Sequence, residues 1–190
     1  PEQWAADREY EPIVDDGLLT DGHWTCDRTT PSGETRCIFH RASDEKDGGA
    51  VLRRFLEELS TKPSETTTDA VANNRFIGAK FQDFDFSNRV IRLDNNVPVD
   101  LRFSHVAGDL KCDQFVVENT FRFEGSVVEG EADFRRCRGA SIVDLSGCVF
   151  ERGADFSDSR FEDHVWAIET RFRGATKFDR TDVRGDLCLA

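Results

Sequence analysis

The chain has 190 residues, of which 38% are hydrophobic, and a formal net charge of −12. This length suits one domain with a small appendage, and no apolar run approaches the length of a membrane span. The acidic balance, with 37 acidic against 25 basic residues, disfavours direct nucleic-acid binding, which needs a basic stripe. It favours a protein from a salt-rich cytoplasm or, alternatively, a DNA-like negative surface for a nucleic-acid-binding partner. The sequence opens without a secretory signal pattern, so we expect a cytoplasmic protein with reduced thiols.

The first 22 residues form an acidic segment with scattered apolar side chains. They show no clean hydrophobic period. We therefore expect residues 1–22 to be an arm that packs through a few apolar residues or is partly disordered.

Four potential metal ligands frame the segment HWTCDRTTPSGETRCIFH at residues 23–40. His23 and Cys26 are spaced H-x2-C, Cys37 and His40 are spaced C-x2-H, and a loop with a Pro-Ser-Gly turn joins the pairs. Two such pairs can place nitrogen and sulfur donors at the corners of a tetrahedron, the geometry of structural zinc. We predict a zinc knuckle with these four ligands. It would be structural rather than catalytic because no coordination position stays open.

The ligand set leaves alternatives open. His23 is the ligand whose place another group could take. The two cysteines could instead be a reduced pair beside two surface histidines. A disulfide between Cys26 and Cys37 is a further alternative.

A short amphipathic helix is predicted over about residues 49–60, after a polar link. Leu52, Phe55, Leu56 and Leu59 follow the spacing i, i+3, i+4, i+7. Residues 61–69 read as a loop. The first coil of a repeat stack exposes an apolar end, so we expect the helix to cover that end, braced by the knuckle, rather than to bind a partner.

An 11-residue repeat dominates residues 99–189. Apolar residues recur at every eleventh position, namely Leu101, Cys112, Phe123, Phe134, Leu145, Phe156, Ala167, Phe178 and Leu189. A second series lies five residues on, and each series is preceded two residues earlier by another inward position. Two inward residues at i and i+2 on a short extended segment point to the same face, and turns separate one such pair from the next. A fixed period of this kind is the signature of a solenoid.

Alternating side-chain size doubles this period to 22. The inward positions that lie two residues before the Leu101 series alternate in size along the chain. The larger residues are Val99, Phe121, Val143, Val165 and Leu187, whereas Leu110, Ala132, Ala154 and Thr176 are mostly small. A full coil should therefore contain two units and four faces. We expect about five coils, roughly 4.8 Å apart, with residues 76–97 as a first coil offset in register. Gly108, Gly130, Gly174 and Gly185 are expected at corners.

Several segments resemble the pentapeptide-repeat family. They are GADFSDSRF at 153–161, GEADF at 130–134 and GATKF at 174–178. The resemblance covers about 76–190 and implies an all-β solenoid, a right-handed quadrilateral β-helix. The chain departs from the family by inserting one residue in every second repeat. It also places Phe115 and Phe121 where small residues are usual, which predicts local widening.

The resemblance extends to the knuckle. WTC…CIFH followed by a helix is similar to the front end of pentapeptide-repeat proteins from halophilic archaea. The expected organisation is then an arm at 1–22, a knuckle with capping helix at 23–62, a linker at 63–75 and a β-helix at 76–190.

The repeat region shows no catalytic constellation. His105 and His164 fall between inward stations and do not stack, while Asp133 and Asp155 stack with Lys177 as a charge ladder. Three cysteines, Cys112, Cys137 and Cys148, are expected as core filler. A rod offers no cleft for acid–base chemistry, and no phosphate loop or nucleophile elbow occurs.

We therefore expect a non-enzyme that acts as a structural or protein-interaction scaffold. The apolar ending LCLA favours a homodimer through the coil ends or a longer chain. One alternative, implied by the family's quinolone-resistance members, is a DNA mimic that inhibits or protects gyrase. Another is a zinc- or redox-responsive regulatory domain of a larger protein such as a membrane channel.

Overall fold

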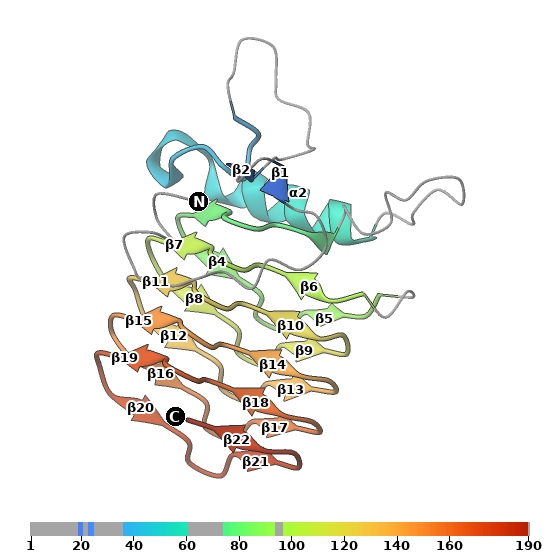
Figure 1. The fold of residues 1–190 in the computed structure, drawn as a ribbon, viewed down its shortest axis with the longest axis vertical. Helices are drawn as coiled ribbons and strands as arrows, with labels where there is room; N and C mark the ends of the chain where they lie inside the picture. Colours follow the sequence, from blue (N-terminus) through green and yellow to red (C-terminus); the bar gives the residue numbers. More distant parts are fainter. Residues whose placement is uncertain (1–18, 21–22, 25–35, 61–73, 94–96, 190) are drawn as a thin grey trace.

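The computed structural model describes residues 19–20, 23–24, 36–60, 74–93 and 97–189. Strands β1 (Leu19–Thr20) and β2 (His23–Trp24) form an antiparallel pair in which Leu19 lies opposite Trp24. A 3₁₀ turn, η1 (Ser43–Glu45), precedes the helix α2 (Gly48–Ser60). All remaining strands belong to a stack of coils (Figure 1). The loop of the predicted knuckle at 25–35, most of the predicted arm and most of the predicted linker lie outside the described residues.

Twenty two-residue strands form four parallel five-stranded sheets, which we name after one strand of each. The β6 face contains β6 (Val99–Asp100), β10 (Phe121–Arg122), β14 (Val143–Asp144), β18 (Val165–Trp166) and β22 (Leu187–Cys188). The β7 face contains β3 (Lys80–Phe81), β7 (His105–Val106), β11 (Val127–Val128), β15 (Val149–Phe150) and β19 (Arg171–Phe172). The β8 face contains β4 (Phe84–Asp85), β8 (Leu110–Lys111), β12 (Ala132–Asp133), β16 (Ala154–Asp155) and β20 (Thr176–Lys177). The β9 face contains β5 (Val90–Ile91), β9 (Val116–Val117), β13 (Arg138–Gly139), β17 (Arg160–Phe161) and β21 (Asp182–Val183).

The register of these sheets confirms the period of 22. Phe121 pairs with Val143, and Ala132 pairs with Ala154. The first coil is offset, as predicted, because Lys80 pairs with His105, 25 positions on. The chain therefore forms an all-β solenoid of about five coils with four parallel sheets, which fits a quadrilateral β-helix.

One corner of each 11-residue unit requires a left-handed backbone. Eight residues with positive φ recur every eleven positions, namely Phe103, Gln114, Gly125, Arg136, Gly147, Asp158, Glu169 and Arg180. The residue three positions before each of these corners is often an aspartate, whose side chain accepts a hydrogen bond from the backbone N–H two residues further along the chain. Asp133, Asp144 and Asp155 do so at 2.9–3.0 Å. This Asx turn explains why aspartate recurs at that station.

The glycines predicted at corners lie at bends between strands. None of Gly108, Gly130, Gly174 and Gly185 has a positive φ. Stacked turns approach so closely there that a Cβ on Gly130 would overlap the carbonyl group of Gly108. Glycine is thus required by backbone contact between coils rather than by an unusual φ.

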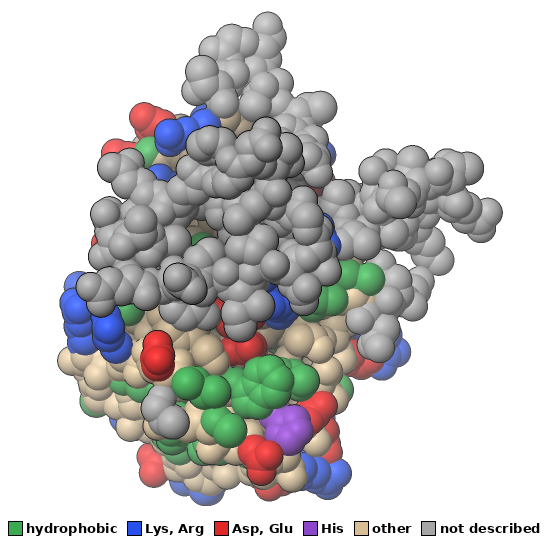
Figure 2. Space-filling view, in the orientation of Figure 1, with side chains coloured by type: hydrophobic (Ala, Val, Ile, Leu, Met, Phe, Trp, Pro, Cys, Tyr) green, Lys and Arg blue, Asp and Glu red, His purple; other side chains and the backbone are tan. Residues whose placement is uncertain are grey.

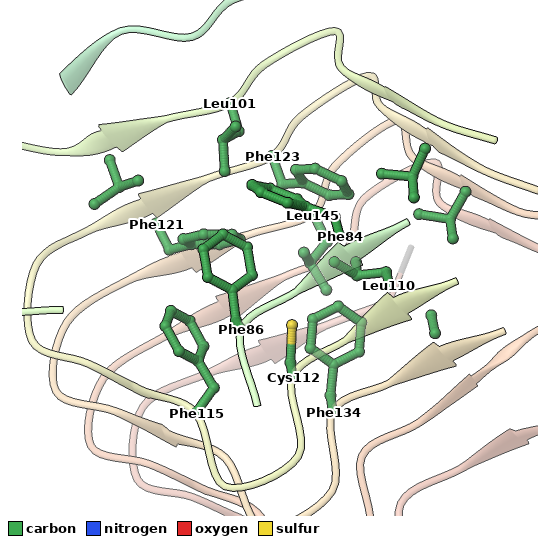
Figure 3. Close-up of a cluster of buried hydrophobic side chains, with 14 of the residues drawn as sticks. Phe84, Phe86, Leu101, Leu110, Cys112, Phe115, Phe121, Phe123, Phe134 and Leu145 are labelled. Atoms are coloured by element: carbon green, nitrogen blue, oxygen red, sulfur yellow. The ribbon is translucent and has the colours of Figure 1, made fainter. Parts of the chain in front are cut away.

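Phenylalanine rings fill the column between the four sheets. Phe134, Phe156 and Phe178 form a stack with centroids 4.8 and 4.9 Å apart. In the earlier coils, Phe115 and Phe121 are both buried and their rings contact Phe86 (Figure 3). The Phe115 ring stacks on Phe86 with 30° between the planes, whereas the Phe121 ring meets Phe86 edge-on.

Helix α2 lies across the first coil (Figure 1). It begins one residue earlier than predicted, where Asp47 Oδ1 accepts the Gly49 N–H at 2.9 Å as an N-cap. Its buried side chains are Val51, Phe55 and Leu59. The Phe55 ring packs against Phe76 and Phe84 with centroids 4.3 and 5.2 Å apart. No helix among the described residues is long and apolar enough to cross a membrane.

Candidate metal site and interaction surfaces

Two of the four predicted zinc ligands lie in contact with each other. Cys37 and His40 belong to one turn, in which the His40 N–H donates to the Cys37 carbonyl at 3.0 Å. The turn brings Cys37 Sγ within 3.1 Å of His40 Nδ1. Cys37 is buried, with 2% of its surface exposed. The C-x2-H spacing therefore brings these two side chains together within one turn.

The first coil fixes the orientation of the His40 ring. His40 Nε2 lies 2.8 Å from the Ile77 carbonyl oxygen. A carbonyl only accepts, so Nε2 carries the proton and Nδ1 presents its lone pair towards Cys37. Metal-binding histidines are held in this way by a partner on the second ring nitrogen. No sequence signal points to Ile77, because the contact is made by a backbone atom 37 positions away.

Lys46 adds a positive charge beside this turn. Its ammonium donates to the carbonyls of Ile38 and Phe39 at 3.0 and 3.1 Å. Burial lowers the pKa of Lys46 to about 8, although the nearby Cys37 opposes that shift. A cation near a thiol favours the thiolate, the form that binds metal.

The other two predicted ligands are not placed. His23 lies in β2, opposite Thr20, and only its backbone is described, while Cys26 lies outside the described residues. Within the described part of the chain, no cluster of three or more His, Cys, Asp or Glu could hold a metal ion. Tetrahedral bond lengths of about 2.3 Å to sulfur and about 2.0 Å to nitrogen would place the two donors roughly 3.5 Å apart. Cys37 and His40 could reach that separation by a small shift.

The remaining cysteines on the repeat are structural, as predicted. Cys137 Sγ donates to the Cys112 carbonyl at 2.9 Å, and Cys148 Sγ donates to the Phe123 carbonyl at 3.0 Å. Burial raises the pKa of all three thiols above the usual range. Neutral thiols held inside the column are poor nucleophiles and poor metal ligands.

The predicted charge ladder on the β8 face is present. Asp133 pairs in register with Asp155, and Asp155 pairs with Lys177. Arg135 donates to Asp133 at 2.6 and 2.8 Å, and Lys177 lies 3.4 Å from Asp155. Partial burial tends to raise the pKa of Asp133, but the bonds from Arg135 outweigh it and lower the pKa. Two carboxylates held ionised in this way are not an acid–base pair.

The two histidines of the repeat have separate polar partners. His105 Nε2 lies 2.8 Å from Glu129 Oε1. His164 Nδ1 accepts the Asp186 N–H at 2.9 Å. They lie on different parts of the surface, so they form no shared site.

The outer surface of the β6 face changes character along the stack. In the early coils it carries Asp100 and Arg102, a buried ion pair at 2.7 Å, and the buried carboxyl of Glu124. In the later coils Trp166 and Ile168 occupy the equivalent outward stations. Figure 2 shows apolar side chains beside a histidine and several acidic groups in this lower region. No motif in the sequence indicated this surface, although the period of 22 places these residues in two neighbouring columns.

Residues 139–185 match the family model described as pentapeptide repeats (9 copies). This match confirms the resemblance over the later coils. No curated protein gives a significant match, and no solved structure does either. The halophilic-archaeal resemblance and the Cys/His knuckle stay predictions.

Proposed function

We propose that this chain is a non-catalytic scaffold whose pentapeptide-repeat solenoid presents its faces and ends to protein partners. One observation carries the proposal: the polar side chains on the outside of the coils pair with their neighbours along the stack. Glu151 pairs with Arg173 at 3.0 Å, and Asp113 pairs with Arg136 at 2.6 Å. Groups that neutralise each other along a rod do not converge on a substrate.

A screen with generic ester, phosphoester and peptide substrates tests the non-catalytic proposal. We expect no turnover above buffer. Turnover that disappears in Asp133→Asn or Asp155→Asn, with Asp113→Asn as a matched control, would contradict it.

The last coil supports association through the coil ends. Strands β19–β22 each have one neighbour within their sheet over residues 97–189, and Leu187 and Leu189 are 40% and 52% exposed. Unpaired strand edges with apolar side chains favour pairing with another chain. We expect light scattering to show a dimer that Leu189→Glu dissociates and Val90→Glu does not. A strict monomer would count against the homodimer but not against a different partner.

A DNA mimic that acts on gyrase is the second candidate. The net charge of −12 supports it, but several acids on the described faces are paired with arginine, including Asp158 with Arg180. A supercoiling assay with a cognate gyrase tests this candidate. Absence of both inhibition and protection at concentrations well above that of the enzyme would reject it.

For the N-terminal segment we propose a structural zinc site formed by His23, Cys26, Cys37 and His40. Support comes from the contact of Cys37 Sγ with His40 Nδ1 and from the ring orientation imposed by Ile77. Zinc would neutralise the thiolates and tie the segment to the first coil. The reduced pair, the disulfide and a redox-responsive site remain the competing outcomes.

Metal analysis combined with thermal melting separates these outcomes. A structural site should contain about one zinc per chain, and chelation should lower the melting temperature. Cys37→Ser should abolish zinc binding, whereas the matched control Cys188→Ser should retain it. Metal-free protein with two fewer titratable thiols before reduction would indicate the disulfide. A metal-free protein with all thiols titratable would indicate the reduced pair.

We also propose that α2 caps the first coil. The burial of Phe55 against Phe76, Phe84 and Phe86 supports this role. Phe55→Ala should destabilise the protein by about 3–5 kcal/mol and increase binding of a hydrophobic dye. Arg53→Ala, on the exposed side of the helix, is the control. An equal effect of both substitutions would argue against the cap.

The acidic, Lys-poor surface supports adaptation to a salt-rich cytoplasm. Salt would screen the repulsion among the excess carboxylates. We expect the unfolding midpoint to rise markedly between low and molar potassium chloride. A midpoint independent of salt would oppose the halophilic assignment.

A further inference from the structure

The outward-facing columns of the β6 face carry an apolar patch that is not part of the hydrophobic core. In register, the column runs through Asp100, Arg122, Asp144, Trp166 and Cys188. The neighbouring column contains Ile168, which is 44% exposed. We define the Trp166 patch as Ile142, Trp166, Ile168 and Cys188, all partly or largely exposed. Apolar side chains grouped on the outside of a rod mark an interaction site.

The patch does not depend on the end of the stack. Trp166 and Ile168 point away from the core, whose inward residues here are Val165 and Ala167. A further coil paired with β22 would lie beneath these strands rather than over their outer surface. The patch would therefore stay accessible if the coil ends were covered.

The Trp166 side chain is held in place before any partner arrives. The His164 ring lies 6.1 Å from the Trp166 ring, with 29° between the planes. His164 is itself fixed, since Nδ1 accepts the Asp186 N–H and Nε2 lies 3.4 Å from Asp163. A preorganised aromatic side chain loses little entropy on binding, which is typical of anchor residues in interfaces.

The rim of the patch is acidic, and the nearest arginine in its column is Arg122, which lies in register with Asp144. The segments 142–147, 163–169 and 186–189 contain no Lys or Arg. They contribute Asp144, Asp163, Glu169 and Asp186, the last with 80% of its side chain exposed. On the other faces many acids have an arginine partner, as Glu151 has in Arg173. At the patch, Asp163 and Asp186 lie 3.4 Å from the His164 ring and not against an arginine, so much of the negative field is available to a partner.

We propose that the Trp166 patch binds a basic segment of a partner protein that also carries apolar side chains. Lysine or arginine would be attracted both to the acidic rim and to the face of the Trp166 ring, while apolar side chains would cover Ile168. A second copy of this chain is disfavoured because it would bring two acidic rims together. The proposal specifies a partner class for the proposed scaffold and rests on that function.

Synthetic peptides and NMR test the proposal with the full chain. The probes are a short peptide with Arg and Leu in a Gly-Ser background, a second with Glu for each Arg, and a third with Gly for each Leu. We expect the Arg/Leu peptide to shift the Trp166 indole resonance and the amides of residues 144–147 and 164–169. The Glu/Leu peptide should cause no shift, and the Arg/Gly peptide should bind more weakly.

Surface variants identify the contacts. Trp166→Ser and Ile168→Ser should each weaken binding of the Arg/Leu peptide by about tenfold. Val90→Ser, at an apolar residue that is 65% exposed on the β9 face, is the matched control and should bind normally. Asp144→Asn combined with Glu169→Gln should weaken binding and reduce its salt dependence. The melting temperature of each variant reports whether the fold is retained.

Three results would overturn the proposal. They are equal binding of the Glu/Leu peptide, undiminished binding by a folded Trp166→Ser variant, or shifts spread over all four faces. Any of these would leave association through the coil ends intact. Substrate turnover, by contrast, would reject the scaffold itself.

Discussion

The rings of Phe134 and Phe156 lie parallel, with 2° between their planes and 4.8 Å between their centroids. The ring separation equals the usual spacing of about 4.8 Å between paired strands. Because Ala132 pairs with Ala154 in register, identical residues on neighbouring coils must stack at the spacing of the backbone. The core is thus a column whose repeat is imposed by hydrogen bonding.

Phe156 should be the most sensitive position of this stack. Phe156→Ala removes a ring that contacts one ring on each side and should lower the unfolding free energy by about 3–5 kcal/mol. Phe156→Leu should cost much less, because Leu145 occupies the equivalent station one unit earlier. Urea denaturation measures both. Equal losses of unfolding free energy in the two variants would indicate that the volume of the side chain at this station does not stabilise the column.

A hydroxyl ladder provides a second test. Ser159 Oγ donates to the Phe134 carbonyl at 2.6 Å and accepts the Cys137 N–H at 2.9 Å. Ser159→Ala should therefore cost about 1–3 kcal/mol of unfolding free energy. Ser104→Ala is the matched control, since the buried Ser104 Oγ has no hydrogen-bond partner among the described residues. That control should be neutral or slightly stabilising, and similar losses in both variants would contradict the ladder.

Substitutions at the two kinds of corner should have opposite effects on stability. Gly130→Ala would place a methyl group against the Gly108 carbonyl and should destabilise by about 2 kcal/mol or more. Gln114→Gly, at an exposed residue with φ of 58°, should raise stability by about 0.5 kcal/mol because a left-handed backbone suits glycine. Thermal melting compares them. A neutral Gly130→Ala would show that the stacked turns can separate.

Glu124 should make stability fall as the pH rises. Burial raises the pKa of Glu124 to about 7, Asp144 adds to the shift, and Arg122 and Arg102 oppose it. The unfolded chain releases the same proton near the ordinary glutamate pKa of about 4.3. Between these values the folded state binds more protons, so the unfolding free energy decreases through that window.

Glu124→Gln provides the comparison for this effect. The wild type should lose on the order of 1–3 kcal/mol relative to Glu124→Gln between pH 5 and pH 8. Denaturation at both pH values measures the difference. If the wild type instead gained stability relative to the variant, the ion pair of Glu124 with Arg122, 3.1 Å long, would outweigh burial.

The column of inward side chains and its period could be predicted from the sequence alone. Inward and outward stations differ in polarity, which indicates the 11-residue unit and the helical stripe containing Phe55, and the alternating size of the inward residues indicates the 22-residue coil. The C-x2-H spacing lies within one turn and brings Cys37 and His40 into contact, but their role as zinc ligands stays a prediction. Cys26 and the side chain of His23 stay predictions.

Features that depend on distances between coils appear only in the folded chain. The overlap at Gly130, the bond from His40 to the Ile77 carbonyl and the burial of Glu124 arise between segments far apart in the chain. The same is true of the Trp166 patch. Its residues occupy stations that hold charged or polar groups elsewhere, and their exposure beside an acidic rim is set by how neighbouring coils stack. A repeat specifies which side chains face outward, but the assembled surface determines which of them lack partners.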